Sequence, residues 1–298
     1  MHQATESERL GAHVSTQGGV HTAPARGGAI GANAIQIFTK TPNQWREPEI
    51  GEEIRTAFRS EYERHELHAA VAHDSYLINL ASPVPELNAR SVDSFTRELR
   101  RCTALGVPYV VSHPGNYIDA RDAGLERNAR GYTACLRAVP GPVMVLVETT
   151  AGTGTALGSS FEELATLRSL IADDVRHRIG VCADTCHLYA AGYDLVNDFD
   201  GVWTRFDRLL GLTALHCLHL NDSKTAFASR RDRHELIAEG SLGAEPFRRI
   251  MTDPRFRGVI KILETPKGDD DEVTEDRRML RRLRAYARGR RPRAGGTD

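Results

Sequence analysis

The chain lacks several features that would each place it in a particular class of proteins. No apolar run reaches the roughly 18 residues of a membrane-spanning helix, and no charged and then apolar leader opens the sequence. The five cysteines are odd in number and form no C-x-x-C pair, so a disulfide scaffold is not indicated. The net charge of -1 points to no particular partner. We therefore expect a cytoplasmic protein with reduced thiols and no membrane partner.

What the chain does contain is an eightfold alternation of short apolar runs with helical patterns. The runs are nearly continuous in hydrophobicity, which is typical of parallel strands covered on both faces. They are Leu10–Val14, Ala34–Phe38, Ala69–Ala72, Tyr109–Ser112, Val143–Val147, Ile179–Ala183, Ala214–Leu218 and Val259–Leu263. The helical patterns are Gly18–Gly31, Glu52–His65, Val92–Leu105, Gly124–Ala138, Phe161–Ile171, Val202–Leu210, Pro246–Met251 and Glu272–Tyr286.

Eight strand-then-helix units predict an α/β fold, a single-domain (β/α)8 TIM barrel. The barrel is expected to span residues 10–288. Residues 1–9 would be an N-terminal extension, and the Arg- and Gly-rich residues 289–298 a tail without fixed structure.

Nine side chains of metal-binding types lie at the ends of the last six predicted strands or in the loops that follow. They are His73, His113, Glu148, Asp184, His187, His219, Asp232, His234 and Glu264. Active sites of such barrels gather at the carboxyl ends of the strands, so we expect a metal site at that rim. Five imidazoles and four carboxylates suit zinc or manganese better than calcium or magnesium.

Nine ligands are too many for one ion and suit three, if one carboxylate is shared. Three clustered divalent ions indicate phosphate ester chemistry, because close cations activate water and stabilise both oxygens of an in-line displacement. The four carboxylates would also raise each other's pKa if they lay together without cations. A centre with excess positive charge would attract a phosphodiester.

Each candidate has a simpler interpretation when taken alone. Asp184 would cap a helix N-terminus equally well, although its i,i+3 spacing from His187 lets both side chains project in one direction. The triplet 232–234 reads as a charged loop, unless an extended backbone turns its first and third residues to one side. Cys186 is more typical of a small buried hydrophobe than of a ligand. Lone histidines are usually hydrogen-bonded rim residues, and strand-end glutamates can pair with arginine. The coincidence of so many candidates on one rim favours metal binding.

Two loops on the same predicted rim offer contacts to a nucleic acid. The loop 73–80 is unusually apolar, so Tyr76 and Leu77 would be exposed there and could wedge into a duplex minor groove, although ordinary loop packing is an alternative. The loop 39–45 offers the cation of Lys40, amides that include Asn43, and the ring of Trp45. We predict Tyr76, Leu77, Lys40 and Asn43 as DNA-binding residues.

Together these segments resemble the endonuclease IV family of apurinic/apyrimidinic endonucleases. Any one stretch is a weak signal, but the set runs in the family's order from residue 10 to about residue 266 and is highly specific. The matching stretches are Gly11–Ser15, Gln36–Lys40 with Trp45, His73–Leu80, His113–Gly115, Glu148 with Thr150–Gly152, Asp184–His187 with Ala190–Asp194, His219–Asp222, Asp232–His234 and Leu263–Thr265.

The resemblance implies a barrel with three zinc ions, one of them replaceable by manganese, that acts in base excision repair. It would hydrolyse the phosphodiester 5′ to an abasic site and leave a 3′-hydroxyl and a 5′-deoxyribose phosphate. Glu148 would be the catalytic residue and bridge two ions. The first ion would take His73, His113 and Glu148, the second Glu148, Asp184, His219 and Glu264, and the third His187, Asp232 and His234. The partner would be double-stranded DNA with abasic sites, bound by a monomer without an obligate protein partner, near the nucleoid if the chain is bacterial.

The chain departs from the family at four positions. Asn43 stands where many relatives have arginine, and Thr149 where asparagine is frequent. Ala228 and Ala238 stand where glycine is common, which puts the shape of the loop around Asp232 in doubt.

Two other functions stay open. A single-metal sugar isomerase or epimerase on the same barrel would need only Glu148, Asp184, His219 and Glu264, and would leave the other five candidates without purpose. A non-catalytic DNA-lesion-binding protein would not need an intact ligand set.

Overall fold

The structure, a computed structural model, describes residues 8–268 and 273–289. Most of the predicted extension 1–9 and nearly all of the tail 289–298 lie outside the described residues. Of the extension, Glu8 and Arg9 are described and contact the barrel. The Glu8 carboxylate pairs with Lys261, and the Arg9 carbonyl accepts a hydrogen bond from the Lys261 amide at 2.8 Å.

Eight parallel strands form a closed barrel, which confirms the predicted fold. Their order around the barrel is β1-β10-β7-β6-β5-β4-β3-β2, so each strand pairs with its neighbours in sequence among these eight. The strands are β1 (Leu10–His13), β2 (Ala34–Phe38), β3 (Ala69–His73), β4 (Tyr109–Ser112), β5 (Met144–Glu148), β6 (Ile179–Asp184), β7 (Leu215–His219) and β10 (Ile260–Leu263).

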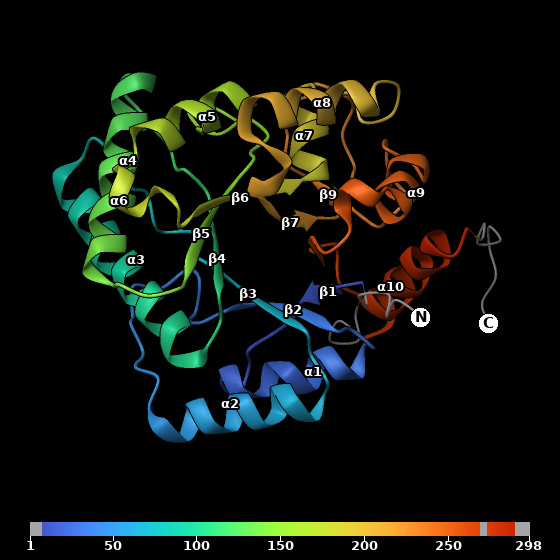
Figure 1. The fold of residues 1–298 in the computed structure, drawn as a ribbon, viewed down its shortest axis with the longest axis horizontal. Coiled ribbons are helices and arrows are strands. Elements are labelled where there is room, and N and C mark those ends of the chain that lie inside the picture. Colours follow the sequence, from blue (N-terminus) through green and yellow to red (C-terminus); the bar gives the residue numbers. More distant parts are fainter. Residues whose placement is uncertain (1–7, 269–272, 290–298) are drawn as a thin grey trace.

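Helices surround the strands, as Figure 1 shows. They are α1 (Ala23–Ala29), α2 (Glu52–Arg64), α3 (Pro85–Leu105), α4 (Arg121–Ala138), α5 (Phe161–Leu170), α6 (Asp173–Arg176), α7 (Thr185–Ala191), α8 (Phe199–Leu210), α9 (Glu245–Thr252) and α10 (Val273–Ala287), with 3-10 turns η1 (Val20–Thr22), η2 (Leu212–Ala214) and η3 (Pro254–Phe256). One apolar core lies between strands and helices, and a smaller one fills the barrel interior.

Some elements differ from the prediction for identifiable reasons. Helix α3 begins at Pro85 and not at Val92, because proline fits the first helical position and the mostly polar residues after it hide the apolar period. The helices α6 and α7 are too short to show a period. A hairpin of β8 (Asp222–Ser223) and β9 (His234–Glu235) was not predicted, since two-residue strands show no alternation.

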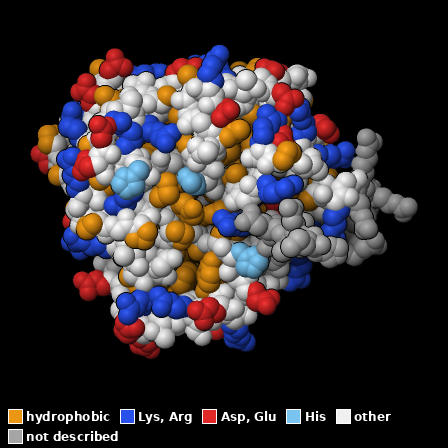
Figure 2. All heavy atoms as spheres, viewed as in Figure 1, with side chains coloured by type: hydrophobic (Ala, Val, Ile, Leu, Met, Phe, Trp, Pro, Cys, Tyr) orange, Lys and Arg blue, Asp and Glu red, His pale blue; other side chains and the backbone are white. Residues whose placement is uncertain are grey.

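The described surface is mixed in charge. On the face drawn in Figure 2, hydrophobic side chains gather near the centre, and acidic and basic side chains are interspersed around them. No helix within the described residues is long and apolar enough to cross a membrane. All five cysteines lie within the described residues, are buried and form no disulfide there.

Candidate metal centre

The barrel brings the candidate side chains to one rim because parallel strands all end there. His73, Glu148, Asp184 and His219 are the last residues of β3, β5, β6 and β7. His113 and Glu264 come directly after β4 and β10, while His187 lies in α7, Asp232 just before β9 and His234 in β9.

The nine side chains form three groups, and in each group the possible ligand atoms lie within 4.8 Å of one another. The groups are His73, His113 and Glu148; then Glu148, Asp184, His219 and Glu264; and His187, Asp232 and His234. Glu148 belongs to two of them, so the clusters are contiguous. Two further groups contain cysteine: Asp184, Cys186 and His234, and Cys182, Cys217 and His219.

Glu148 lies at the centre of four imidazoles. Its Oε2 is 3.2 Å from both His73 Nε2 and His113 Nε2, and its Oε1 is 3.0 Å from His219 Nδ1 and 3.3 Å from His187 Nδ1. Burial disfavours the charged carboxylate, but the charges of His113 and His219 outweigh it and hold the pKa of Glu148 well below its ordinary value. The carboxylate is therefore ionised at neutral pH.

Asp232 joins the two histidines of the third group. Its Oδ2 lies 3.1 Å from His187 Nε2 and its Oδ1 3.1 Å from His234 Nε2. Despite that short distance, His234 Nε2 makes no hydrogen bond of acceptable geometry. Burial disfavours the imidazolium, yet attraction to Asp184 and Asp232 raises the pKa of His234 to about 9.

Backbone carbonyls orient three of the imidazoles through Nδ1. His73 Nδ1 lies 2.9 Å from the Asp74 carbonyl, His187 Nδ1 2.8 Å from the Thr149 carbonyl, and His234 Nδ1 3.1 Å from the Glu264 carbonyl. A donating Nδ1–H leaves Nε2 free to face the carboxylates, which is the arrangement that metal-binding histidines adopt.

Asp184 caps a helix with one oxygen and leaves the other beside the cluster. Its Oδ1 accepts a hydrogen bond from the His187 amide at 2.8 Å and so caps α7. Its Oδ2 accepts from Asn221 Nδ2 at 2.6 Å and lies 3.9 Å from His219 Nδ1. One oxygen therefore supports the helix, and the other faces the cluster.

Three polar residues around the cluster were not among the predicted site residues. Gln36 contacts His219 Nε2 through Oε1 at 2.7 Å and donates from Nε2 to Glu264 Oε1 at 2.6 Å. His13 Nδ1 lies 3.4 Å from the same Glu264 oxygen. The side chain of Asn221 donates to Asp184 and accepts from the Glu264 amide at 2.9 Å. The signal that could have identified Gln36 is a glutamine in the middle of an otherwise apolar strand, where it is fully buried.

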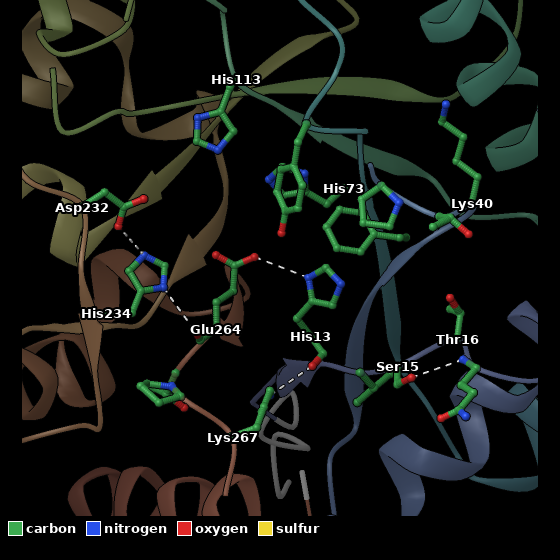
Figure 3. A pocket seen from close by; sticks show the side chains of 18 of the residues that line it. His13, Ser15, Thr16, Lys40, His73, His113, Asp232, His234, Glu264 and Lys267 are labelled. Atoms are coloured by element: carbon green, nitrogen blue, oxygen red, sulfur yellow. Dashed lines mark hydrogen bonds and ion pairs between the residues drawn. The ribbon is translucent and has the colours of Figure 1, made fainter. Parts of the chain in front are cut away.

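A cavity of about 660 Å³ opens above these groups. Figure 3 shows Glu264 pointing into it near His13, with His113, Asp232 and His234 on one side and His73 on another. Tyr76 and Phe38 also line it. Solvent can therefore reach several of the imidazoles and carboxylates of the cluster through this cavity.

The four predicted DNA-contacting residues differ in how far they are exposed to solvent. The side chain of Tyr76 is 70% exposed, with its ring 5.3 Å from that of Phe38, while Leu77 is half-buried and Asn43 exposed. Lys40 is buried and is among the residues that line the cavity, but its ammonium is directed away from His13 and Glu264 (Figure 3).

The Lys40 ammonium is occupied within the protein. Its Nζ donates to Glu47 Oε1 at 2.7 Å, to the Gln44 carbonyl at 3.0 Å and to Ser94 Oγ at 3.2 Å. The cation is thus bound within the protein, and the contact of Lys40 with DNA stays a prediction. Sequence reasoning could not see the buried partner, because Ser94 comes from a helix far along the chain.

The two alanines at positions where glycine is common keep a glycine-like backbone. Ala228 has a φ of 57° and Ala238 a φ of 64°, both in the left-handed region. The loop keeps this conformation at a cost of about 1–2 kcal/mol for each non-glycine residue.

The fold and this rim define a (β/α)8 barrel protein with a dense imidazole and carboxylate centre. The chain matches the family model described as a xylose isomerase-like TIM barrel over residues 25–283. A probable endonuclease 4 of Chloroflexus aurantiacus is 48% identical over 286 residues, which are 94% of this chain and 99% of the relative. A probable endonuclease 4 of Geobacter sulfurreducens is 46% identical over 285 residues, covering 93% and 96%. The chain therefore belongs to the endonuclease 4 family.

Solved structures agree with this assignment. Endonuclease IV from Thermus thermophilus superposes with a TM-score of 0.83 at 38% identity, covering 94% of this chain and 99% of that one. A D-tagatose 3-epimerase-like protein superposes with a TM-score of 0.68 at 15% identity, which shows a shared fold only.

Proposed function

We propose that this endonuclease hydrolyses the phosphodiester 5′ to an abasic site in double-stranded DNA and leaves a 3′-hydroxyl and a 5′-deoxyribose phosphate. The observation that carries the proposal is the buried carboxylate of Glu148, which lies within 3.3 Å of four imidazoles, three of which line an open cavity. The family membership supports a nuclease, and the cavity suits a nucleotide that has no base to hold it in the stack.

The donor set fits zinc. Imidazole nitrogens and carboxylate oxygens in groups of three and four are the usual ligands of that ion. In the metal-free protein, protons on the imidazoles balance the carboxylates: burial opposes protonation of His73, but attraction to Glu148 raises its pKa to about 9. A site that holds this much positive charge without metal would accept divalent cations in place of those protons.

We assign His73, His113 and Glu148 to a first ion, Glu148 with Asp184, His219 and Glu264 to a second, and His187, Asp232 and His234 to a third. When bound, the ions would supply activation of water and stabilisation of the attacking and leaving oxygens of the phosphodiester. We also propose that the protein acts as a monomer in the cytoplasm, and that manganese can replace zinc at one site.

The protein's own residues have separate tasks in this proposal. Glu148 stays ionised and holds the first two groups together. Gln36 fixes the orientation of His219 and Glu264 from below. Tyr76 and Leu77 wedge into the minor groove and unstack the duplex, which favours DNA that unstacks easily at the lesion.

The sugar isomerase alternative is weaker. One metal would occupy only Glu148, Asp184, His219 and Glu264, and would leave the His187, Asp232 and His234 group unused. The likeness to epimerases extends only to the fold.

The direct test combines metal analysis with incision of a duplex that carries one synthetic abasic site. We expect about three ions per chain and a 3′-hydroxyl product. Glu148→Gln should lower turnover by at least roughly 100-fold, because it removes the charge shared by two groups. The matched control is Glu162→Gln on α5, an exposed carboxylate paired with Arg205, which should leave the rate unchanged. A single ion per chain, or wild-type turnover in Glu148→Gln, would contradict the proposal.

A further inference from the structure

Two cysteine thiols lie inside the barrel directly beneath the metal centre. Side chains alternate along a strand, so Cys182 faces the same way as Asp184 in β6, and Cys217 the same way as His219 in β7. The strand register pairs Cys182 with Cys217 and Asp184 with His219. The thiols therefore form the layer next below two of the proposed zinc ligands.

These thiols and His219 are close enough to share an ion. Both Sγ atoms and a nitrogen of His219 lie within 4.8 Å of one another, and all three residues are fully buried. A tetrahedral ion with metal–sulfur bonds of about 2.3 Å places its ligands roughly 3.8 Å apart, so only small movements would be required. The apolar cluster of the barrel interior surrounds these thiols, and its member Ile260 pairs in register with Cys217.

The chemistry of this layer differs from that of the rim above it. Carboxylates and imidazoles suit zinc and harder ions, whereas thiolates select soft ions. Two thiolates would neutralise a divalent cation, which burial in an apolar layer requires. Their two protons would leave to solvent as the ion enters.

We propose that Cys182, Cys217 and His219 form a second, inhibitory site for a soft divalent cation such as cadmium. His219 connects the two layers: its Nδ1 lies 3.0 Å from Glu148 Oε1 and its Nε2 2.7 Å from Gln36 Oε1. An ion bound by Cys182 and Cys217 also binds one of these two nitrogens. It thereby draws His219 out of the cluster around Glu148. A soft cation therefore inhibits the enzyme from inside the barrel, without competing for the substrate.

The test adds CdCl2 in steps to the zinc-loaded full-length protein and follows two signals after long incubation. The first is the ultraviolet charge-transfer band of thiolate bound to cadmium, and the second is incision of the abasic duplex. The variant is Cys182→Ala with Cys217→Ala. The matched control is Cys102→Ala with Cys135→Ala, which removes two other buried thiols, in α3 and α4. Cys217→Ala alone serves if the double variant does not fold.

We expect the band and a loss of incision of roughly 10- to 100-fold in the wild type and in the control, the loss typical of a disturbed metal ligand. The loss of incision should be absent from Cys182→Ala with Cys217→Ala, and the band should fall to what Cys186 at the rim can supply. No band in the wild type, or an unchanged band in that variant, would overturn the site. A band without loss of incision would show that the bound cation does not remove His219 from the cluster around Glu148, and would overturn the inhibitory role. The absorbance measurement does not depend on the proposed substrate, so a failure there is separable from a failure of the proposed function.

Discussion

At the scale of single residues, Ala228 and Ala238 carry a local strain that the rest of the loop maintains. The Ala228 amide donates to the Tyr189 carbonyl at 3.1 Å, which ties the left-handed turn to α7. The same loop carries Asp232, so its shape decides where that carboxylate lies. The strained backbone of this loop therefore helps to place Asp232 beside His187 and His234.

We expect Ala228→Gly to stabilise the protein by about 0.5–1 kcal/mol. Glycine adopts a positive φ without a steric cost, and the exposed methyl group of Ala228 loses little burial. Chemical denaturation measures the change. Ala226→Gly is the control, because Ala226 is exposed in the same loop and is not among the residues with positive φ. Equal effects of the two substitutions would show that strain is not the cause.

How far single residues could be predicted depends on where their partners lie. The nine candidate ligands were recognisable because each lies near the end of an apolar run or in the loop after one, and all such runs end at one rim. Gln36 was not, because its partners His219 and Glu264 lie 183 and 228 residues away along the chain. For Lys40 only the distant partner Ser94, 54 residues away, was hidden for the same reason, since Gln44 and Glu47 lie nearby in sequence.

At the scale of elements, a buried ionic network fixes the loop after β2. Glu47 accepts from Lys40 at 2.7 Å, from Ser94 at 2.6 Å and from Arg101 at 2.6 Å, and so joins the loop to α3. The loop in turn holds the next one, because Ser75 Oγ donates to the Pro42 carbonyl at 2.5 Å. The segment that carries Tyr76 is thereby positioned from two sides.

We expect Glu47→Gln to destabilise the protein by roughly 3 kcal/mol at pH 7, because it leaves buried cations partly unpaired. Burial opposes ionisation of Glu47, but its hydrogen bonds from Lys40, Ser94 and Arg101 lower its pKa below 4.5. A lowered pKa contributes stability above the unfolded value, and this contribution is lost as the pH falls through the folded value. The difference between wild type and variant, measured by denaturation, should therefore shrink below about pH 4.5.

The control for this network is Glu52→Gln on α2. Glu52 forms an exposed ion pair with Arg55, a kind of pair that contributes little. Its effect on stability should be close to zero at every pH. An equally small effect of Glu47→Gln would mean that the network does not hold the loop.

The exposed tip of the next loop makes a separate prediction. Tyr76→Ala with Leu77→Ala should lower incision of an abasic duplex by roughly 10- to 100-fold, because stacking on the bases beside the lesion is lost. Metal content should stay unchanged. Leu170→Ala removes an exposed hydrophobic side chain at the end of α5 and should have no effect. Unchanged kinetics in the double variant would reject the wedge.

Elements were predictable where they were long and periodic. The eight strands and the helix α2 lie within one or two residues of the expected bounds, because each buries a continuous apolar run or stripe. The hairpin of β8 and β9 was not predictable, because its two-residue strands form only when the barrel brings Ser223 opposite His234.

At the scale of the whole molecule, the barrel brings acidic and basic side chains close together at one rim, where their charges must balance. Four carboxylates and five imidazoles would not gather in water without cations or protons between them. In the metal-free protein, protons on the imidazoles offset the negative charge of the carboxylates. The buried His73 and the half-buried His234, both beside carboxylates, have pKa values raised to about 9, above the ordinary 6.5.

This balance predicts how chelation and pH act together on stability. A raised pKa contributes stability that is complete below pH 6.5 and is lost as the pH rises through about 9. Metal-free protein should therefore melt at a progressively lower temperature between pH 6.5 and pH 9. Zinc-loaded protein should melt at a higher temperature throughout and change little in this range, since bound imidazoles carry no proton to lose.

Calorimetry of both forms across this range measures the effect. His73→Gln should make the fall in the metal-free protein shallower, because one of the two groups that titrate near pH 9 is gone and only His234 remains. His65→Gln, on a half-buried imidazole beside Glu61 after α2, should leave it unchanged. Parallel curves for the metal-free and zinc-loaded forms would mean that protons and metal ions do not replace one another at this rim, and the assignment of its histidines as ligands would then fail.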